Sequence, residues 1–339
     1  MKSLPFSSFY TVLATLLIGL AALSCRKEVE IVLPGPLIEG QPSAASMAGK
    51  PLSTAGSAFK FTVDLYVVNK SGRYVSGLSK QHFSIPDNTV SQRKYTLDDV
   101  KTASLVNKPG GYSAMILLDQ SGSILTTDPN DLRIEGSKIF LDYLGKDDYV
   151  SLVSFPTNSS DSRAKYHKGF SRDINAMKAS LDTLAQTERG GTPLYKTAFE
   201  VTNYTAANAK TVNKAVIVFT DGADTDGGKS LQNVIDNAVQ KSIPIFTVGL
   251  SSGVDVNVLS QMANETGGAF FWAKDAKQLI TSFGTLGNLL RGTAQVYRTY
   301  WTVTRATGTW RAGDVVTGTI KVDLKNGEII EVPFWVKVQ

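Results

Sequence analysis

Three short segments of the chain carry oxygen side chains at spacings that suit a hard metal ion. Residues 119–123 read DQSGS, which places oxygens at positions i, i+2 and i+4. Residues 190–192 (GGT) place a hydroxyl after two glycines, which let a loop approach closely, and residues 220–222 (TDG) add a carboxylate. Mg²⁺, Mn²⁺ and Ca²⁺ bind such oxygens, and Mg²⁺ keeps a position for an outside ligand. The candidate ligands of one divalent cation are Asp119, Ser121, Ser123, Thr192 and Asp221.

These segments fall at the ends of elements in a predicted central α/β block. Mostly apolar runs, typical of strands covered on both faces, occupy residues 114–118, 149–155, 215–219 and 243–250. Helical stretches alternate with them at residues 173–184, 193–207, 230–241 and 256–266, and an earlier helix is expected to begin at Asp128-Pro129. This order predicts a doubly wound, Rossmann-like, mostly parallel sheet, with its ligand site at the C-terminal ends of the strands.

Two β-rich segments flank this block. Residues 59–67 alternate apolar and polar side chains, as a half-buried strand does. Near the C-terminus, Asn326-Gly327 is a hairpin signal, and Pro333 predicts that the last strand lies at a sheet edge. Each flank has about four strands, so we expect both to build one β-sandwich into which the α/β block is inserted, with two separate β modules as the alternative. The expected parts are residues 58–108, 112–291 and 293–339.

The N-terminus has the order of an export signal. Lys2 precedes an uncharged apolar run at residues 9–23, which is shorter than the ~20 residues that span a bilayer. Residues 22–25 (ALSC) resemble a bacterial lipobox, in which a lipid is attached to the cysteine and the signal is cut just before it. A plain signal peptide with an incidental cysteine is the alternative. We expect a signal peptide at 1–24, a lipid on Cys25, a flexible tether at 25–57, and a place in the cell envelope, at the outer membrane or cell surface.

The composition excludes several classes of function. The 339-residue chain has one cysteine and two histidines, too few for an intrachain disulfide, a structural zinc site or a Cys–His enzyme. His82 and His167 lie in strand-like segments away from the three loops, and neither supports a catalytic triad. The 35 basic and 30 acidic residues give a net charge of +5, but they are scattered, so we expect no nucleic-acid partner.

The three loops, in this order, resemble the von Willebrand factor A domain and its metal-ion-dependent adhesion site. Residues 119–123 match the family's Asp-x-Ser-x-Ser, Thr192 matches the threonine of its second loop, and Asp221 matches the aspartate of its third. The resemblance covers about residues 113–291. It implies that the hydroxyls bind the metal directly, that the aspartates bind it directly or through water, and that a partner's carboxylate completes the shell. Asp224 and Gly191 are candidates for the surroundings of the metal, and a solvated acidic loop is the alternative for Asp224.

Two enzymatic interpretations compete with adhesion. Residues 223–230 (Ala223 to Ser230) fit a permissive phosphate-loop pattern, but three nearby aspartates beside one Lys229 would repel a polyphosphate. A metal-dependent hydrolase needs a general base, and no His or Glu lies in the three loops. We therefore expect a lipid-anchored binding protein, not an enzyme, that captures an acidic side chain of a protein partner through a divalent metal. Coupling of binding to movement of the helix at 276–290 is a further hypothesis.

Overall fold

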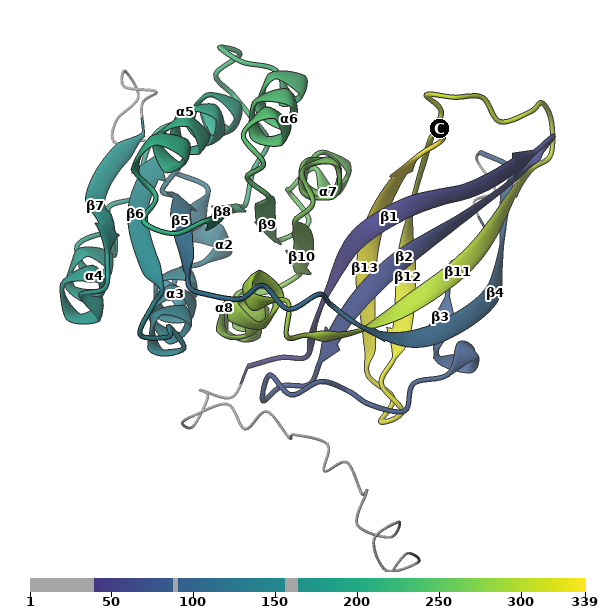
Figure 1. The fold of residues 1–339 in the computed structure, drawn as a ribbon, viewed down its shortest axis with the longest axis horizontal. Coiled ribbons are helices and arrows are strands. Elements are labelled where there is room, and N and C mark those ends of the chain that lie inside the picture. Colours follow the sequence, from purple (N-terminus) through teal and green to yellow (C-terminus); the bar gives the residue numbers. More distant parts are fainter. Residues whose placement is uncertain (1–39, 88–90, 156–163) are drawn as a thin grey trace, which may run out of the picture. The chain divides into compact units, whose positions relative to one another are not determined.

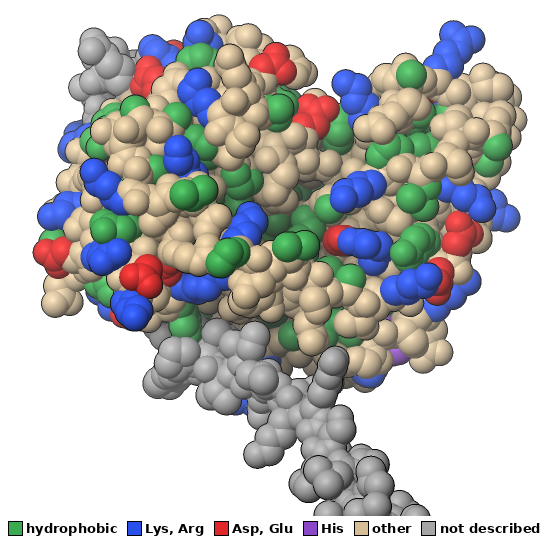
Figure 2. Space-filling model, in the orientation of Figure 1, with side chains coloured by type: hydrophobic (Ala, Val, Ile, Leu, Met, Phe, Trp, Pro, Cys, Tyr) green, Lys and Arg blue, Asp and Glu red, His purple; other side chains and the backbone are tan. Residues whose placement is uncertain are grey.

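The computed structural model describes residues 40–87, 91–155 and 164–339 (Figure 1). The expected signal peptide, Cys25 and the expected tether as far as residue 39 lie outside the described residues. Within the described part, none of the helices has the length and apolar character that crossing a bilayer requires. Lys and Arg side chains are spread over the face shown in Figure 2 rather than gathered in one stripe.

The α/β part has the predicted parallel sheet. Its strands lie in the order β10-β9-β8-β5-β6, all parallel, and β7 is added antiparallel at the end. Because β5 has β6 on one side and β8 on the other, the strand order reverses there, which is where such sheets bind ligands. The bounds are β5 (Tyr112–Asp119), β6 (Tyr149–Phe155), β7 (Lys165–Ser171), β8 (Asn213–Thr220), β9 (Ile245–Leu250) and β10 (Ala269–Ala273).

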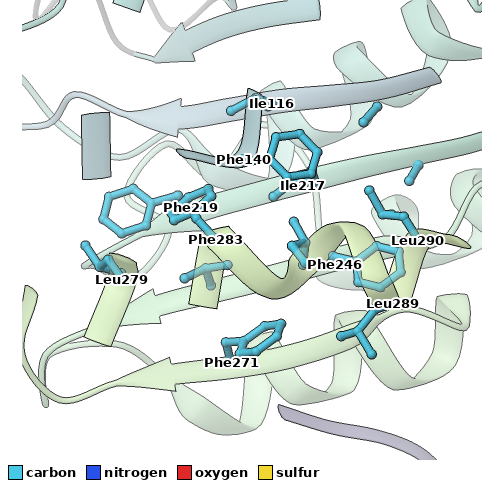
Figure 3. Close-up of a cluster of buried hydrophobic side chains, with 14 of the residues drawn as sticks. Ile116, Phe140, Ile217, Phe219, Phe246, Phe271, Leu279, Phe283, Leu289 and Leu290 are labelled. Carbon is cyan, nitrogen blue, oxygen red and sulfur yellow. The ribbon is translucent and has the colours of Figure 1, made fainter. Parts of the chain in front are cut away.

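Helices cover both faces of this sheet because successive strand residues point to opposite sides. Ile116 and Leu118 pack in one core with α3, α4 and α8, which Figure 3 shows around Phe140 and Phe283. Leu117 packs in a second core with α5, α6 and α7. The bounds are α2 (Ile124–Thr127), α3 (Leu132–Asp142), α4 (Ile174–Asp182), α5 (Leu194–Asn208), α6 (Leu231–Gln240), α7 (Val256–Thr266) and α8 (Ala276–Arg291).

Helix α3 begins later than the sequence predicts. The expected start was Asp128-Pro129, but the helix begins at Leu132, after a turn that places Asp131 at φ 54°. The Asp128 carboxylate still satisfies the helix start, since it accepts the N–H groups of Leu132 and Arg133 at 2.8 and 3.0 Å. The predicted N-cap and start are therefore wrong, since Asp131 is the N-cap, although the Asp128 carboxylate still accepts N–H groups of the first turn.

Segments from both ends of the chain form a β-sandwich, as expected. One side has the strand order β4-β11-β2-β1 and the other has β13-β12-β3. The predicted apolar face of residues 59–67 fills the space between them, where Phe61 stacks on Phe334 with ring centroids 5.5 Å apart. The bounds are β1 (Ser43–Ala55), β2 (Ala58–Val68), β3 (Phe83–Ser84), β4 (Arg93–Ser104), β11 (Gln295–Arg305), β12 (Val315–Asp323) and β13 (Ile329–Lys337), with a 3-10 turn η1 (Lys80–His82).

Strand β1 corrects the expected tether, which was to continue to residue 57. Residues 43–55 pair antiparallel with β2 on one side and with β10 on the other, so that Ala45 lies opposite both Tyr66 and Phe271. The sandwich sheet and the α/β sheet are thereby one ten-stranded sheet. Many residues of β1 are small, so the sequence shows no apolar periodicity there. The close packing at Gly49 excludes a larger side chain, because a Cβ there would lie 2.7 Å from the carbonyl oxygen of Trp335.

Strand β2 is also more buried than its alternating pattern predicts. Asp64 and Tyr66, expected to face solvent, are each 2% exposed. Arg298 forms a bidentate pair with Asp64 at 2.8 Å for both bonds, and Asn288 of α8 donates to the Tyr66 hydroxyl at 3.2 Å. Burial raises the pKa of Tyr66 to about 12. Pro333 lies on the edge strand β13 as predicted, but it is buried, and Ser46 donates to its backbone carbonyl at 2.6 Å.

Deleting β1 tests its structural role. We expect a chain without residues 1–55 to lose more than ~3 kcal/mol of unfolding free energy, because the edges of β2 and β10 and the surface around Met47 become exposed. A chain without residues 1–39 keeps β1 and is the control. Urea denaturation measures both, and equal unfolding free energies would show that β1 is dispensable.

Candidate metal centre

The first loop holds a buried carboxylate between two donors of the chain. Asp119 ends β5 and is fully buried. Its Oδ1 accepts the backbone N–H of Ser121 at 2.7 Å, and its Oδ2 accepts the hydroxyl of Thr220 at 2.6 Å. The carboxylate is therefore fixed by both the first and the third loop.

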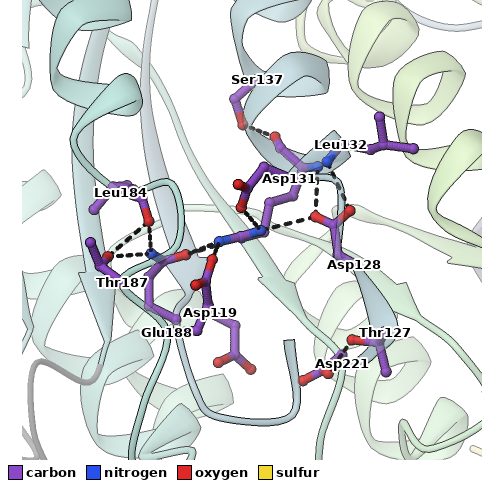
Figure 4. A network of polar contacts seen from close by, with 12 residues as sticks. Asp119, Thr127, Asp128, Asp131, Leu132, Ser137, Leu184, Thr187, Glu188 and Asp221 are labelled. Carbon is purple, nitrogen blue, oxygen red and sulfur yellow. Dashed lines mark hydrogen bonds and ion pairs between the residues drawn. The ribbon is translucent and has the colours of Figure 1, made fainter. Parts of the chain in front are cut away.

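Hydroxyl groups connect this loop to the third. The Oγ atoms of Ser121 and Ser123 lie 3.0 Å apart, and Ser123 donates to Oδ1 of Asp221 at 2.7 Å. Thr127, at the end of α2, donates to Oδ2 of the same aspartate at 2.5 Å (Figure 4). The structure thus places Asp119, Ser121, Ser123 and Asp221 in one hydrogen-bonded group, and their binding of a cation stays a prediction.

The second loop approaches the first through backbone contacts. The N–H of Gly122 donates to the carbonyl of Gly190 at 3.1 Å, and the N–H of Arg189 donates to the carbonyl of Gln120 at 2.8 Å. The hydroxyl of Thr192 faces the third loop, since a Cβ at Gly222 would lie 3.4 Å from its Oγ1. Thr192 therefore lies against Gly222, the residue that follows Asp221 in the third loop.

Two glycines permit this approach. Gly190 has φ 81°, which disfavours other residues. A Cβ at Gly191 would lie 2.7 Å from Oγ1 of Thr225. That hydroxyl oxygen also accepts the backbone N–H of Thr192 at 2.7 Å. Gly191 thus acts through close packing, and its expected place in the surroundings of a metal stays a prediction.

The donor set suits a hard divalent cation. Burial, and then the charge of Asp221, raise the pKa of Asp119 to about 7. A cation between the loops would relieve that repulsion. Within the described residues, no group of three or more His, Cys, Asp and Glu side chains could hold a metal ion. A cation at these loops would therefore need their hydroxyl oxygens as well as the carboxylates. Two carboxylates and three hydroxyls fit Mg²⁺ or Mn²⁺ better than they fit a metal ion that prefers thiolate or imidazole ligands.

A family model described as the von Willebrand factor type A domain matches residues 115–285, just over half of the chain. The chain belongs to this family. The match contains all three loops and ends within α8. The family and the α/β fold that the sequence predicts are therefore confirmed. Among curated proteins, no relative was found.

Several solved structures are similar to this chain. Proximal thread matrix protein 1 from the mussel byssus, with a zinc-occupied MIDAS motif, has 19% identity over 58% of this chain and 49% of its own, with a TM-score of 0.46. A von Willebrand factor type A protein from Catenulispora acidiphila has 11% identity over 89% and 75%, with a TM-score of 0.48. An aerotolerance-related membrane protein from Bacteroides fragilis has 16% identity over 53% and 98%, with a TM-score of 0.42. The match to the mussel protein thus spans about half of that protein's length.

Two polar residues that contact the candidate site, Thr127 and Thr220, were not predicted. Thr127 lies four residues after Ser123, so the helical turn of α2 brings its hydroxyl to the same side. Thr220 directly precedes Asp221. The position of these two threonines close to the motif in the sequence is the signal that could have identified them. Asp224 has a local role: it accepts the N–H groups of Tyr195 at 2.9 Å and Gly227 at 3.3 Å, and so caps the start of α5.

The phosphate-loop-like segment is not arranged as an open anion cradle. The N–H of Gly227 is bonded to the Asp224 carboxylate, and the ammonium group of Lys229 lies 4.4 Å from the centroid of the Phe199 ring. Ser230 caps α6 by accepting the N–H of Asn233 at 3.2 Å. These contacts use groups that a bound phosphate would need.

Neither histidine supplies a base to the metal loops. His167 lies 2.7 Å from Ser154 (Nε2 to Oγ), and burial, with the nearby Lys165, lowers its pKa to about 4. The pair borders a cavity of about 90 Å³, and none of the described residues that line it is an Asp or Glu that could orient the ring. Nδ1 of His82 lies 2.9 Å from the backbone N of Ser79, in a turn of the sandwich.

Proposed function

We propose that this chain is a lipid-anchored binding protein of the cell envelope whose von Willebrand factor type A domain captures an acidic side chain of a protein partner through Mg²⁺ or Mn²⁺. The observation that carries the proposal is the hydrogen-bonded group of Asp119, Ser121, Ser123 and Asp221, with Thr192 beside it. Domains of this family are mainly interaction modules, which favours binding over catalysis.

The chain's own residues suit the capture of an anion. A bound divalent cation supplies a positive charge with a position open to a carboxylate. Ser121, Ser123 and Thr192 are neutral, so they would hold the cation without cancelling its charge. The carboxylate of Asp221 already accepts two hydroxyl donors, which spread its negative charge away from an incoming acid.

The N-terminal sequence supports the anchoring part of the proposal. The apolar run at residues 9–23 lies just before Cys25, and the described structure begins at Gly40, so residues 26–39 would connect the lipid to the folded part. Growth with labelled palmitate tests this directly: we expect label in the wild type and none in Cys25→Ala. Label that persists in Cys25→Ala would contradict the anchor.

Metal-dependent binding to a carboxylate surface tests the main proposal. We expect the full chain to bind immobilised poly-L-glutamate with Mg²⁺ or Mn²⁺ at physiological salt and to release it in EDTA. Thr192→Val keeps size and net charge but removes one hydroxyl, so binding should weaken ~10-fold or more. Thr302→Val, the same change in β11, is the control and should bind as the wild type does. Binding that is indifferent to EDTA would contradict the proposal.

The NTPase alternative has its own test. We expect no Mg²⁺-dependent phosphate release from ATP by the full chain, and unchanged Mn²⁺ affinity in Lys229→Ala, because Lys229 packs on Phe199 rather than on the metal loops. ATP hydrolysis that disappears in Lys229→Ala would favour the NTPase instead.

A further inference from the structure

A buried cluster of charged residues is centred on Arg133 of α3. Its partners Asp128, Asp131 and Glu188 are labelled in Figure 4. Its guanidinium is fully buried and pairs with Asp128 at 3.0 Å and Asp131 at 2.7 Å. It also pairs with Glu188, whose side chain is 2% exposed. Nε and Nη2 both donate to Oε1 of Gln120, at 3.0 and 2.6 Å. One side chain therefore joins α3 to two separate loops.

One of these partners belongs to the first loop of the candidate metal site, and another lies two residues before the second loop. Gln120 lies between Asp119 and Ser121, and Glu188 lies shortly before Thr192. The Nε2 group of Gln120 also donates to the carbonyl of Leu184 at 2.7 Å, so both ends of this amide are bonded. Arg133 thus contacts the first loop from within the motif and the second loop at its base.

Its chemistry suits this clamping role. Desolvating one guanidinium and several carboxylates is costly, and a buried ion cluster is weak evidence for stability alone. The planar guanidinium directs several donors in a fixed fork, which a lysine ammonium cannot reproduce. These directed hydrogen bonds therefore restrict the relative positions of Gln120 and Glu188 more than apolar packing would.

We propose that Arg133 is a positioning residue that holds the first and second metal loops in register, so that Ser121 and Thr192 can serve the same cation. This inference rests on the proposed function. Arg133 would act through Gln120 and Glu188, without touching the cation or the partner itself.

Mn²⁺ titration calorimetry of the full chain tests this role with a double-mutant cycle. We expect Arg133→Met and Gln120→Met each to raise the Mn²⁺ dissociation constant ~10- to 100-fold, as loss of an outer partner of a metal site does. The double variant should bind Mn²⁺ no more weakly than the single variant with the lower Mn²⁺ affinity, because both changes break the same connection. Arg298→Met, which breaks the bidentate pair with the buried Asp64, should lower thermal stability and leave Mn²⁺ affinity unchanged.

The outcomes separate this inference from the proposed function. A wild type that binds no Mn²⁺ would overturn the proposed function. If the wild type binds Mn²⁺ and a folded Arg133→Met variant binds it with the same affinity, only the positioning role is overturned. Should Arg133→Met not fold, Gln120→Met decides, because it leaves the ion pairs of Arg133 in place; wild-type affinity in Gln120→Met would likewise overturn the inference.

Discussion

Asp119→Asn is expected to weaken Mn²⁺ binding ~100-fold and, in the same protein without metal, to raise stability at pH 8. The carboxylate is fully buried and near Asp221, so its ionised form is costly in the absence of a cation. Asparagine keeps an acceptor for the N–H of Ser121. Its amide can donate to Thr220, whose hydroxyl can turn to the carbonyl of Gly222, 3.2 Å away. The gain in unfolding free energy should reach up to ~4 kcal/mol.

The opposite signs of the two effects identify a metal site. Calorimetry measures Mn²⁺ affinity, and urea denaturation in EDTA measures stability. Asp148→Asn is the matched control: Asp148 is also buried, but it pairs with Arg291 and accepts the N–H groups of Tyr112 and Gly145. We expect that control to lose stability and keep its Mn²⁺ affinity. Loss of stability in Asp119→Asn with unchanged Mn²⁺ binding would mean that Asp119 is only structural.

Mn²⁺ affinity is expected to fall ~10-fold per pH unit as the pH decreases below about 7. The pKa of Asp119 is raised to about 7, so at lower pH the cation must displace a proton from it. Above pH 7 the carboxylate is already ionised and the affinity should level off. Calorimetry between pH 5.5 and 8 in buffers of different ionisation enthalpy counts the released protons. An affinity that is flat across this range would contradict an Asp119 that titrates near neutrality.

The metal-free protein should show the reverse trend in stability. Between about pH 4 and 7 the folded chain holds a proton on Asp119 that the unfolded chain has lost, since the ordinary pKa is 3.8. Its unfolding free energy therefore falls as the pH rises through this window. His167 acts in the opposite direction between its lowered pKa of about 4 and its ordinary 6.5. The contribution of His167 cancels in the difference between the unfolding free energies of the wild type and Asp119→Asn. A difference that does not change with pH would contradict the raised pKa of Asp119.

The parts of the site that the sequence predicts are local ones. Residues 119–123 carry their oxygens within one loop, and buried parallel strands such as β5 and β8 are continuous apolar runs. Parallel strands place their C-terminal ends at one edge of the sheet. The first and third loops could therefore be placed together without any knowledge of side-chain contacts.

The parts that escaped prediction depend on contacts between distant residues. Arg133 meets Gln120 and Glu188 across 13 and 55 positions of the chain, and no local pattern distinguishes it from a solvent-facing helical arginine. Strand β1 is hidden for a different reason. Its alanines, serines and glycine resemble a linker, and only the close approach of β2, β10 and Trp335 explains why small residues are needed there.

Electron paramagnetic resonance of Mn²⁺ added to the full chain at pH 8 is the most direct test of the metal centre. It shows whether the three loops hold one divalent cation with a position open to a carboxylate. We expect one bound Mn²⁺ per chain and a change of its spectrum when acetate is added. Asp119→Asn should weaken this binding ~100-fold, and Thr192→Val should also weaken it. A chain that binds no Mn²⁺, or that binds it equally well after both substitutions, would contradict a metal centre at these loops.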